Sequence, residues 1–227
     1  MNYKNFLTLG SKESDVLING LSNSMYLAVI TVLIGMPLSV VTGYALARYK
    51  IKFKNLIISF ILMTIVIPVF TTIIPIYSFF MEHSMLDSML WTSVIFISAF
   101  IPLNIWIIMN YFRELPEDLW EAAAIEGANE RQLFFQIGLP LAKPIVLTSS
   151  LVIFLMSWKQ YIIPMLLLSS HNNKVLTLIM SEFMTRDAIN YSVIAMSGII
   201  VIIPPLLASI IFRKNLVSGL TAGSVKE

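Results

Sequence analysis

Long apolar runs constrain this chain more than any other feature of its sequence. Each of them is long enough to cross the roughly 30 Å apolar layer of a bilayer as a helix. We expect five membrane spans, at residues 24–47, 56–80, 90–112, 144–168 and 191–212. Because a backbone in lipid must satisfy its own hydrogen bonds, these runs predict an all-α, polytopic transmembrane helix bundle.

Composition agrees with a membrane protein and excludes several functions. Of the 227 residues, 57% are hydrophobic and only 12% are charged, and the net charge of +2 is too small to indicate a nucleic-acid partner. There is no cysteine, which excludes disulfides, thiolate metal sites and cysteine nucleophiles. No nucleotide-binding G-x-x-x-x-G-K-[ST] motif occurs, and His83 and His171 lie far apart outside any zinc motif. We therefore expect no catalytic or metal site on this chain.

The distribution of lysine and arginine predicts the orientation of the bundle. Ten of the fifteen basic residues flank one set of span ends, four flank the other, and Lys159 falls inside a span. The positive-inside rule then places segment 113–143 and the tail 213–227 in the cytoplasm. It places the amino terminus and the loop 169–187 outside. Residues 1–21 lack an apolar run and are expected to form a loop or a short surface segment.

Two apolar regions are expected to be irregular. Pro68 and Pro75 fall within the second span, so its middle is predicted to be kinked. The apolar piece Val175–Met180 in the outer loop is too short to span, and is expected to re-enter the membrane or lie at its surface.

The polar segment, residues 113–143, is predicted to form two helices joined at a glycine corner. Pro116 and the acidic residues after it favour a helix start, and Gly127 favours its end, giving a helix from about Pro116 to Glu126. Asn129 and Gln132 have the spacing of a capping box, which predicts a second helix. We expect that helix to end around Gly138, Pro140 and Pro144.

The first of these helices carries large, small and acidic residues side by side. Leu119 and Trp120 supply bulk, Ala122 and Ala123 permit close approach, and Glu121 stands between them. Such a surface suits docking into a groove, and it equally suits an amphipathic helix lying on the membrane. Residue types alone leave both interpretations open.

The order of residues in the polar segment adds a resemblance. Glu121-Ala122-Ala123, then Gly127, then Ile137-Gly138-Leu139-Pro140 resembles the EAA cytoplasmic loop of ABC-importer permeases. Gly43–Tyr49 and the tail Gly219–Lys226 look like the carbohydrate-type members of that family. The resemblance implies the type I ABC importer permease fold and an ATPase-docking role for one set of residues. That set is Leu119, Trp120, Glu121, Ala122, Ala123, Gly127, Leu139 and Pro140.

The same resemblance implies a set of partners. A permease of this kind, in the plasma membrane of a prokaryote, pairs with a second homologous permease and with two ATP-binding subunits, which hold the ATP and Mg. An extracytoplasmic solute-binding protein delivers a sugar. This chain itself would be a non-catalytic subunit without a cofactor.

The chain departs from the family pattern in two respects. Members usually have six spans, so the five found here predict that the family's first helix is missing. Trp158-Lys159-Gln160 stands where Trp-Asn-Glu is common, which leaves the identity of the sugar open.

Polar residues within the spans are candidates for the translocation path. They are Lys159, Gln160, Thr71, Thr72 and Asn104. A lysine in a span suggests function, although Lys159 is near enough to the outer surface to reach the headgroups with its ammonium. The other four could equally form hydrogen bonds between helices.

Three other classes of protein were weighed against this interpretation. A secondary transporter predicts carboxylates inside the spans, whereas all thirteen acidic residues fall in loops, tails or the polar segment. An ABC permease for an amino acid, a peptide or phosphate would share the EAA loop and remains open. A membrane enzyme has the least support, since no nucleophile, base or metal cluster is visible.

Overall fold

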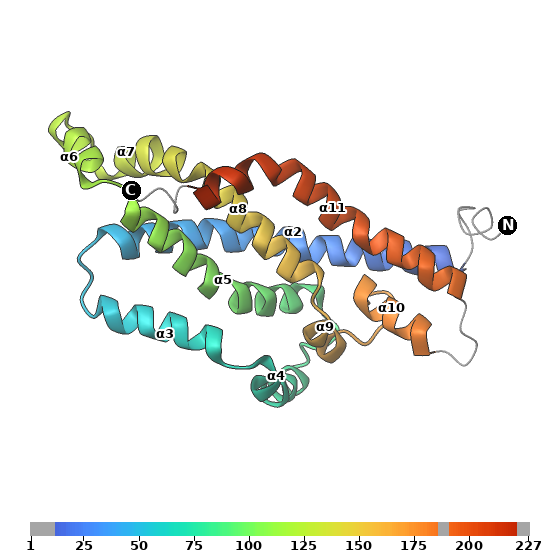
Figure 1. The fold of residues 1–227 in the computed structure, drawn as a ribbon. Coiled ribbons are helices and arrows are strands. Elements are labelled where there is room, and N and C mark those ends of the chain that lie inside the picture. Colours follow the sequence, from blue (N-terminus) through green and yellow to red (C-terminus); the bar gives the residue numbers. More distant parts are fainter. Residues whose placement is uncertain (1–11, 186–190, 222–227) are drawn as a thin grey trace.

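The computed structural model describes residues 12–185 and 191–221, and over these residues the protein is all-helical (Figure 1). In chain order the helices are α2 (Lys12–Arg48), α3 (Lys54–Val66), α4 (Val69–Glu82), α5 (Met89–Glu114), α6 (Glu117–Ile125), α7 (Glu130–Gln132), the π-helix η1 (Leu133–Gly138), α8 (Leu139–Trp158), α9 (Ile162–Leu167), α10 (Leu176–Thr185) and α11 (Tyr191–Thr221).

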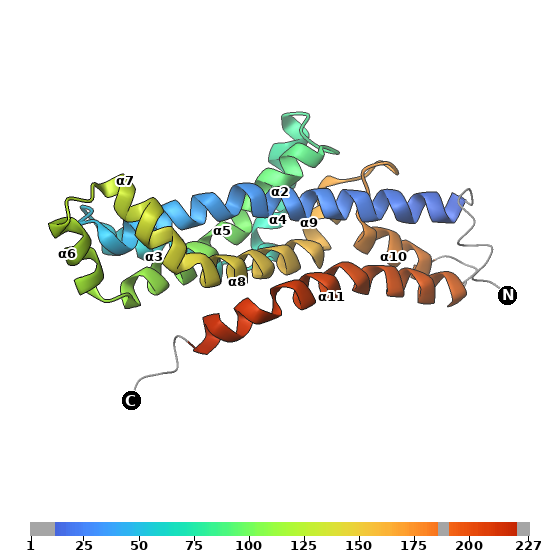
Figure 2. The same cartoon turned by 90° about the horizontal axis from the view of Figure 1, so that it is seen from above.

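The centre of the bundle is formed by α2, α5 and α8, which pack against one another. α11 lies along α8, α3 lies on α5, and α10 fills the space between α2 and α11 at one end (Figure 2). α6 and α7 lie at the opposite end of the bundle, the end at which α2 turns into α3 (Figure 1). The two ends are therefore built differently.

Four described helical segments are long and apolar enough to cross a membrane, and a fifth span is possible by the same criteria if one bent pair counts as a single span. The four are Ser14–Arg48, Met89–Glu114, Glu130–Trp158 and Ile194–Phe212, and the bent pair is Lys54–Val66 with Phe70–Glu82. Each overlaps one of the five runs expected from the sequence, but most helices extend beyond those runs.

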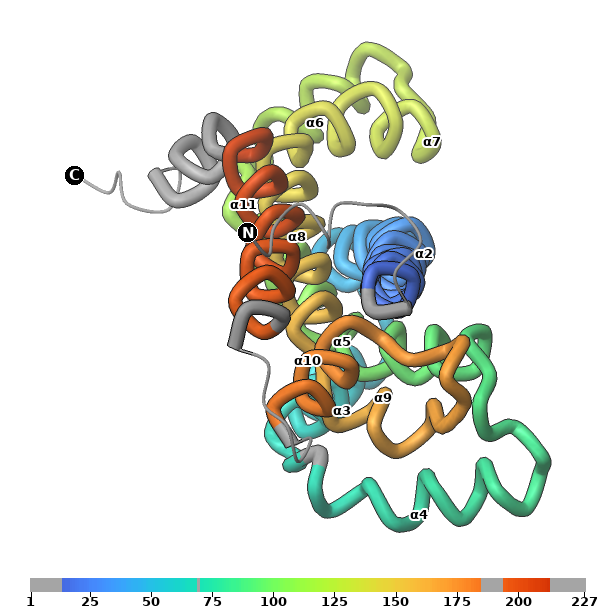
Figure 3. Tube along the Cα trace, turned by 90° about the vertical axis from the view of Figure 1, so that its right-hand side faces the viewer, coloured from blue at the N-terminus to red at the C-terminus, as the bar shows by residue number. Residues whose placement is uncertain are grey.

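The second expected span is broken outright, where a kink was expected. Its two halves meet at 93°, so α4 lies across the bundle axis (Figure 3). The break falls at Ile67, which is extended because the ring of Pro68 disfavours the helical region for the residue before it. Pro75, the other expected kink, lies inside α4 without ending it.

The start of the first long helix differs from expectation. Residues 12–21, expected to form a loop or a short surface segment, are the first turns of α2. Their apolar side chains recur at helical spacing, and Leu17, 1% exposed, packs with Leu176 and Ile179 of α10. An uninterrupted apolar run predicts only the part of a helix that lies in lipid. The amphipathic residues 12–21 contain no such run, so their helix was not predicted.

The fourth expected span also has other limits. α7, η1 and α8 form one continuous helix that passes through Gly138, Pro140 and Pro144. This helix ends at Trp158 rather than at Leu168. Prolines are tolerated in membrane helices, and the wider π-helical turns lie directly before Pro140. The expected tail from residue 213 begins within α11, which reaches Thr221, and residues 222–227 lie outside the described part.

The outer loop is held to the bundle by a partly buried clamp around Asp87. The Asp87 carboxylate accepts hydrogen bonds from the backbone N–H groups of Ser169 (3.1 Å) and Ser170 (2.9 Å), and the Asn173 amide donates to the Asp87 carbonyl (2.7 Å). Burial disfavours the charged carboxylate, but the hydrogen bonds from Ser170, Ser169 and Asn173 outweigh it and lower the pKa of Asp87. On the other side, Asn23 of α2 donates to the carbonyls of Asn172 and Lys174.

Candidate functional site

The two short helices of the polar segment form an elbow, defined here as residues 117–132. α6 follows Pro116 and has Glu117 and Asp118 in its first turn, where the helix dipole favours negative charge. It ends at Gly127, whose φ of +84° suits glycine. The N–H of Ala128 bonds to the carbonyl of Ala123, and that of Gly127 to Ala124, which is a complete Schellman motif. The glycine corner predicted from the sequence is therefore confirmed.

The capping box after the corner is also present. The Asn129 side chain accepts from the N–H of Gln132 (3.0 Å), and the Gln132 side chain accepts from the N–H of Asn129 (2.9 Å). These reciprocal bonds start the continuous helix that runs from Glu130 to Trp158. The elbow is thus joined without a break to a membrane-crossing helix.

Trp120 fixes α6 against the bundle. Its side chain is 2% exposed and lies in a cluster with Tyr44 of α2 and Phe112 of α5. The Tyr44 ring meets it edge-on, with centroids 6.0 Å apart. A Cβ at position 138 would lie 3.3 Å from the indole, so Gly138 leaves the room that Trp120 occupies.

The end of α2 makes the polar contacts to the elbow. The Arg48 guanidinium carbon lies 4.5 Å from the centroid of the Trp120 ring, and Arg48 Nη1 lies 3.2 Å from Glu117 Oε1. The Tyr49 hydroxyl donates to Glu130 Oε2 (2.9 Å). This hydrogen bond, aided by burial and by the negative charge of Glu130, raises the pKa of Tyr49 to about 12. These residues belong to the stretch Gly43–Tyr49, and the contacts give that stretch a physical role.

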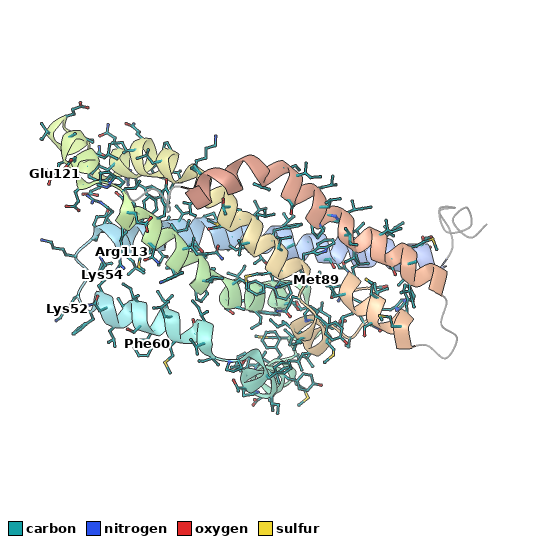
Figure 4. The ribbon with its side chains drawn as sticks, in the orientation of Figure 1. Lys52, Lys54, Phe60, Met89, Arg113 and Glu121 are labelled. Atoms are coloured by element: carbon teal, nitrogen blue, oxygen red, sulfur yellow. The ribbon has the colours of Figure 1, made fainter. Side chains whose placement is uncertain are left out.

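One face of α6 points away from the chain. Asp118, Glu121, Ala122 and Ile125 are all exposed, and their spacing of three, one and three residues places them on a single helix face. Ile125 is 87% exposed and Leu119, at the flank, is 42% exposed. The outward face, as these four residues are called below, is a small apolar surface bordered by carboxylates. Figure 4 shows Glu121 at the free end of the elbow.

The structure divides the predicted docking residues into two groups. Glu121 and Ala122 lie on the outward face, Leu119 at its flank and Pro140 on the exposed side of α8. Trp120 and Ala123 are buried in the chain's own cluster, against which Leu139 also packs. Their side of the helix turns inward, so in this structure they contact their own chain, and their docking role stays a prediction. Ile125 and Asp118 were missed, although their spacing from Glu121 and Ala122 would have indicated them.

The candidate path residues lie on α4, on α5 and at the end of α8. Lys159 is exposed at the end of α8. The Gln160 side chain accepts from the N–H groups of Tyr161 and Ile162, and the Thr71 hydroxyl donates to the carbonyl of Pro68. Thr72 is half-buried in α4. Asn104 is fully buried, with an Oδ1 that has no hydrogen-bond partner among the described residues.

The fold and the elbow define a class of protein, and comparison with known sequences agrees. A family described as "Binding-protein-dependent transport system inner membrane component" matches residues 35–221. The chain belongs to this family. It is therefore a multi-pass membrane subunit of an ABC transporter, a permease, and the resemblance noted from the EAA string is confirmed.

Particular relatives include two sugar-transport permeases. The arabinooligosaccharides transport system permease protein AraQ of Halalkalibacterium halodurans is 28% identical over 204 residues, which cover 90% of this chain and 72% of that protein. The trehalose transport system permease protein SugB of Mycobacterium tuberculosis is 28% identical over 221 residues, covering 96% and 80%.

A solved structure supports the predicted fold. It is that of a bacterial ABC transporter involved in the import of the acidic polysaccharide alginate. One of its chains matches with a TM-score of 0.76 and 22% identity, over 93% of this chain and 78% of that one. The ABC importer permease fold predicted from the sequence is thereby confirmed.

Proposed function

We propose that this chain is one of two homologous permease subunits of an ATP-driven sugar importer. Two ATP-binding subunits bind its cytoplasmic side and hold the ATP and Mg, and an extracytoplasmic binding protein delivers the sugar. The names of the relatives AraQ and SugB support a sugar as substrate. The outward face of α6 carries the rest of the proposal, since it is exposed on an elbow that the chain itself holds in place.

The mechanism depends on how the free energy of ATP hydrolysis reaches this chain. The sequence has no P-loop motif, so ATP hydrolysis acts on the chain through contact with another subunit. Such contact drives transport only if its free energy differs between the inward-facing and outward-facing states. The outward face offers apolar contact at Ile125 and Ala122, and carboxylates at Asp118 and Glu121 for basic residues of the ATPase groove. Trp120 and Arg48 transmit the movement of α6 to the bundle.

Replacing Ile125 with aspartate tests the docking surface. Ile125 has almost no contact with its own chain, so Ile125→Asp should leave folding intact while placing a charge in an apolar contact. We expect the amount of ATP-binding subunit that copurifies to fall at least about tenfold, the effect of losing a strong interface contact.

Gln136→Asp is the matched control. It introduces the same charge at another exposed position of the polar segment, on η1 and away from the outward face of α6. Copurification should remain as in the wild type. Equal capture by the Ile125 variant, or equal loss in both variants, would remove the outward face from the proposal.

The substrate is tested separately by uptake. Cells that contain the chain should take up a labelled oligosaccharide or disaccharide, and cells that lack it should not. Uptake of an amino acid, a peptide or phosphate in place of any sugar would replace the sugar assignment and leave the docking surface untouched.

A further inference from the structure

A group of basic residues at the elbow end of the bundle has no acidic partner within residues 12–185 and 191–221. Lys52, Lys54 and Arg113 lie at this end in Figure 4, where the turn between α2 and α3 meets the last turn of α5. Lys54 lies near enough to Arg113 for the two positive charges to repel. No carboxylate lies within 4.0 Å of any of the three among the described residues, so their charges are not neutralised within this part of the chain.

Local structure keeps two of these charges in place. The Lys54 ammonium donates to the carbonyls of Ala47 (3.2 Å) and Tyr49 (3.4 Å), where the dipole of α2 favours a cation. The Lys52 ammonium lies 5.2 Å from the centroid of the Phe53 ring. Like charges are thus held near one another by dipolar and aromatic contacts that supply no opposite charge, so an anion that binds here would relieve their repulsion.

The start of α3 adds donors to the same place. Phe53 is its N-cap, with φ of 60°, and supplies no side-chain hydrogen bond, and the first turn contains no acidic residue. The Lys54 N–H donates to the Ile51 carbonyl (3.2 Å). The other N–H groups of a first helical turn have no partner within the helix, and together with the helix dipole they attract an anion. Here they lie beside Lys52 and Lys54, so two independent features favour the same ligand charge.

An exposed apolar face continues from the basic group. Phe53 is 67% exposed, and Leu56, Phe60 and Met63 along α3 are each at least 55% exposed. α3 has no buried residue, because it contacts the bundle through one side only. Cationic groups followed directly by exposed apolar side chains match the order of headgroup and acyl chain in a phospholipid. A soluble anion or an acidic protein surface would use only the charged part.

We propose that Lys52, Lys54, Arg113 and the first turn of α3 form a binding site for the phosphate headgroup of an anionic phospholipid of the inner leaflet. The acyl chains lie against Leu56, Phe60 and Met63. Basic groups at the cytoplasmic ends of spans attract anionic lipids by about 1 kcal/mol each, which is about fivefold in affinity. The site would hold α3 beside α5, where the contact within the chain is limited to one side.

The test measures lipid retention by the full chain. The protein is taken from vesicles of phosphatidylcholine and phosphatidylglycerol in equal amounts, and the lipids that remain bound are counted by native mass spectrometry. The wild type should retain phosphatidylglycerol preferentially. The double variant Lys52→Gln, Arg113→Gln should lower that preference by about 25-fold, which is about fivefold for each charge.

Two controls separate the site from net charge and from misfolding. The variant Arg131→Gln, Lys143→Gln removes the same charge from exposed positions on α7 and α8 and should retain the preference. The variant Lys52→Arg, Arg113→Lys keeps both charges and should retain it as well. Equal loss in the Arg131, Lys143 variant, or no loss in the Lys52→Gln, Arg113→Gln variant, overturns the proposal.

Two further measurements distinguish other ligands of the same cluster. Inorganic phosphate and glycerol phosphate are added to the wild type. If either displaces phosphatidylglycerol at millimolar concentration, the site is one for a soluble phosphate and the lipid assignment falls. If the Lys52→Gln, Arg113→Gln variant keeps its lipid and loses copurified ATP-binding subunit, the cluster is a protein interface and the proposal is wrong.

Discussion

Trp120 is the side chain that buries α6 against the bundle, and its contacts give it two separable contributions. The ring fills a space between Tyr44, Phe112 and Gly138, and its face meets the Arg48 guanidinium. Its Nε1, by contrast, is buried without a hydrogen-bond partner among the described residues. The volume of the ring should therefore matter more than the indole N–H.

Two substitutions at this position test that distinction. Trp120→Ala should destabilise the docked position of α6 by about 3–5 kcal/mol, the usual cost of removing a buried aromatic ring. Trp120→Phe should cost about 1 kcal/mol, because most of the ring remains. Hydrogen exchange of the α6 amides measures both effects. Similar exchange rates in the two variants would contradict the packing role.

Tyr49 gives the elbow a pH dependence that can be worked out in sign. The pKa of Tyr49 is raised from 10.0 to about 12 through the hydrogen bond to Glu130, so folding favours the protonated phenol. Its contribution to stability is then complete below pH 10 and is lost as the pH rises from 10 through about 12. The titration of Tyr49 is followed by absorbance, as the difference between a protein with Tyr49 and the same protein with Tyr49→Phe. In the Glu130→Gln variant this difference titration should shift to lower pH. An unchanged titration would show that the bond does not form.

At the scale of elements, the corner at Gly127 sets the direction of α6 relative to the helix that starts at Glu130. No atom lies within 4 Å of the position that a Cβ would take, so the restriction there is conformational and not steric crowding. A residue that tolerates positive φ should be accepted, and a β-branched residue should not.

This difference predicts opposite results for Gly127→Asn and Gly127→Val. Valine should be strained by about 1–3 kcal/mol and should misdirect α6. We expect the reconstituted transporter with valine to hydrolyse ATP while uptake falls about tenfold, the effect of about 1.4 kcal/mol. Asparagine should keep the two activities coupled. Full coupling with valine would mean that the corner does not direct α6.

Local signals in the sequence predicted these helices and the corner between them. They did not predict which side chains of the helices would be buried. Pro116, Gly127, Asn129 and Gln132 act on the backbone within a few residues, so the two helices and the corner could be predicted. Which face of α6 turns inward depends on Tyr44 and Arg48, more than seventy positions from Trp120 in the sequence. Trp120 was therefore assigned to a partner, and Ile125 was overlooked. The exposed position of Lys159 likewise depends on where α8 ends.

At the scale of the whole molecule, Lys52, Lys54 and Arg113 lie at the elbow end in Figure 4. Ten of the fifteen basic residues of the sequence flank the span ends on that side, and four flank the other. This asymmetry predicts the orientation of the bundle in the membrane. The absence of cysteine from the sequence makes it testable, since an introduced cysteine is the one that reacts. In intact cells an impermeant maleimide should label His171→Cys and should label Glu121→Cys only after permeabilisation. The reverse pattern would invert the topology.

The helix from Glu130 to Trp158 crosses the molecule without interruption. Its 29 residues correspond to about 43 Å, so a tilt of about 5° at one end displaces the other by roughly 4 Å. Because residues 130–132 of the elbow belong to this rod, a push on them in the cytoplasm and the response at the external end of the rod should occur simultaneously, with no relay of side-chain rearrangements along it.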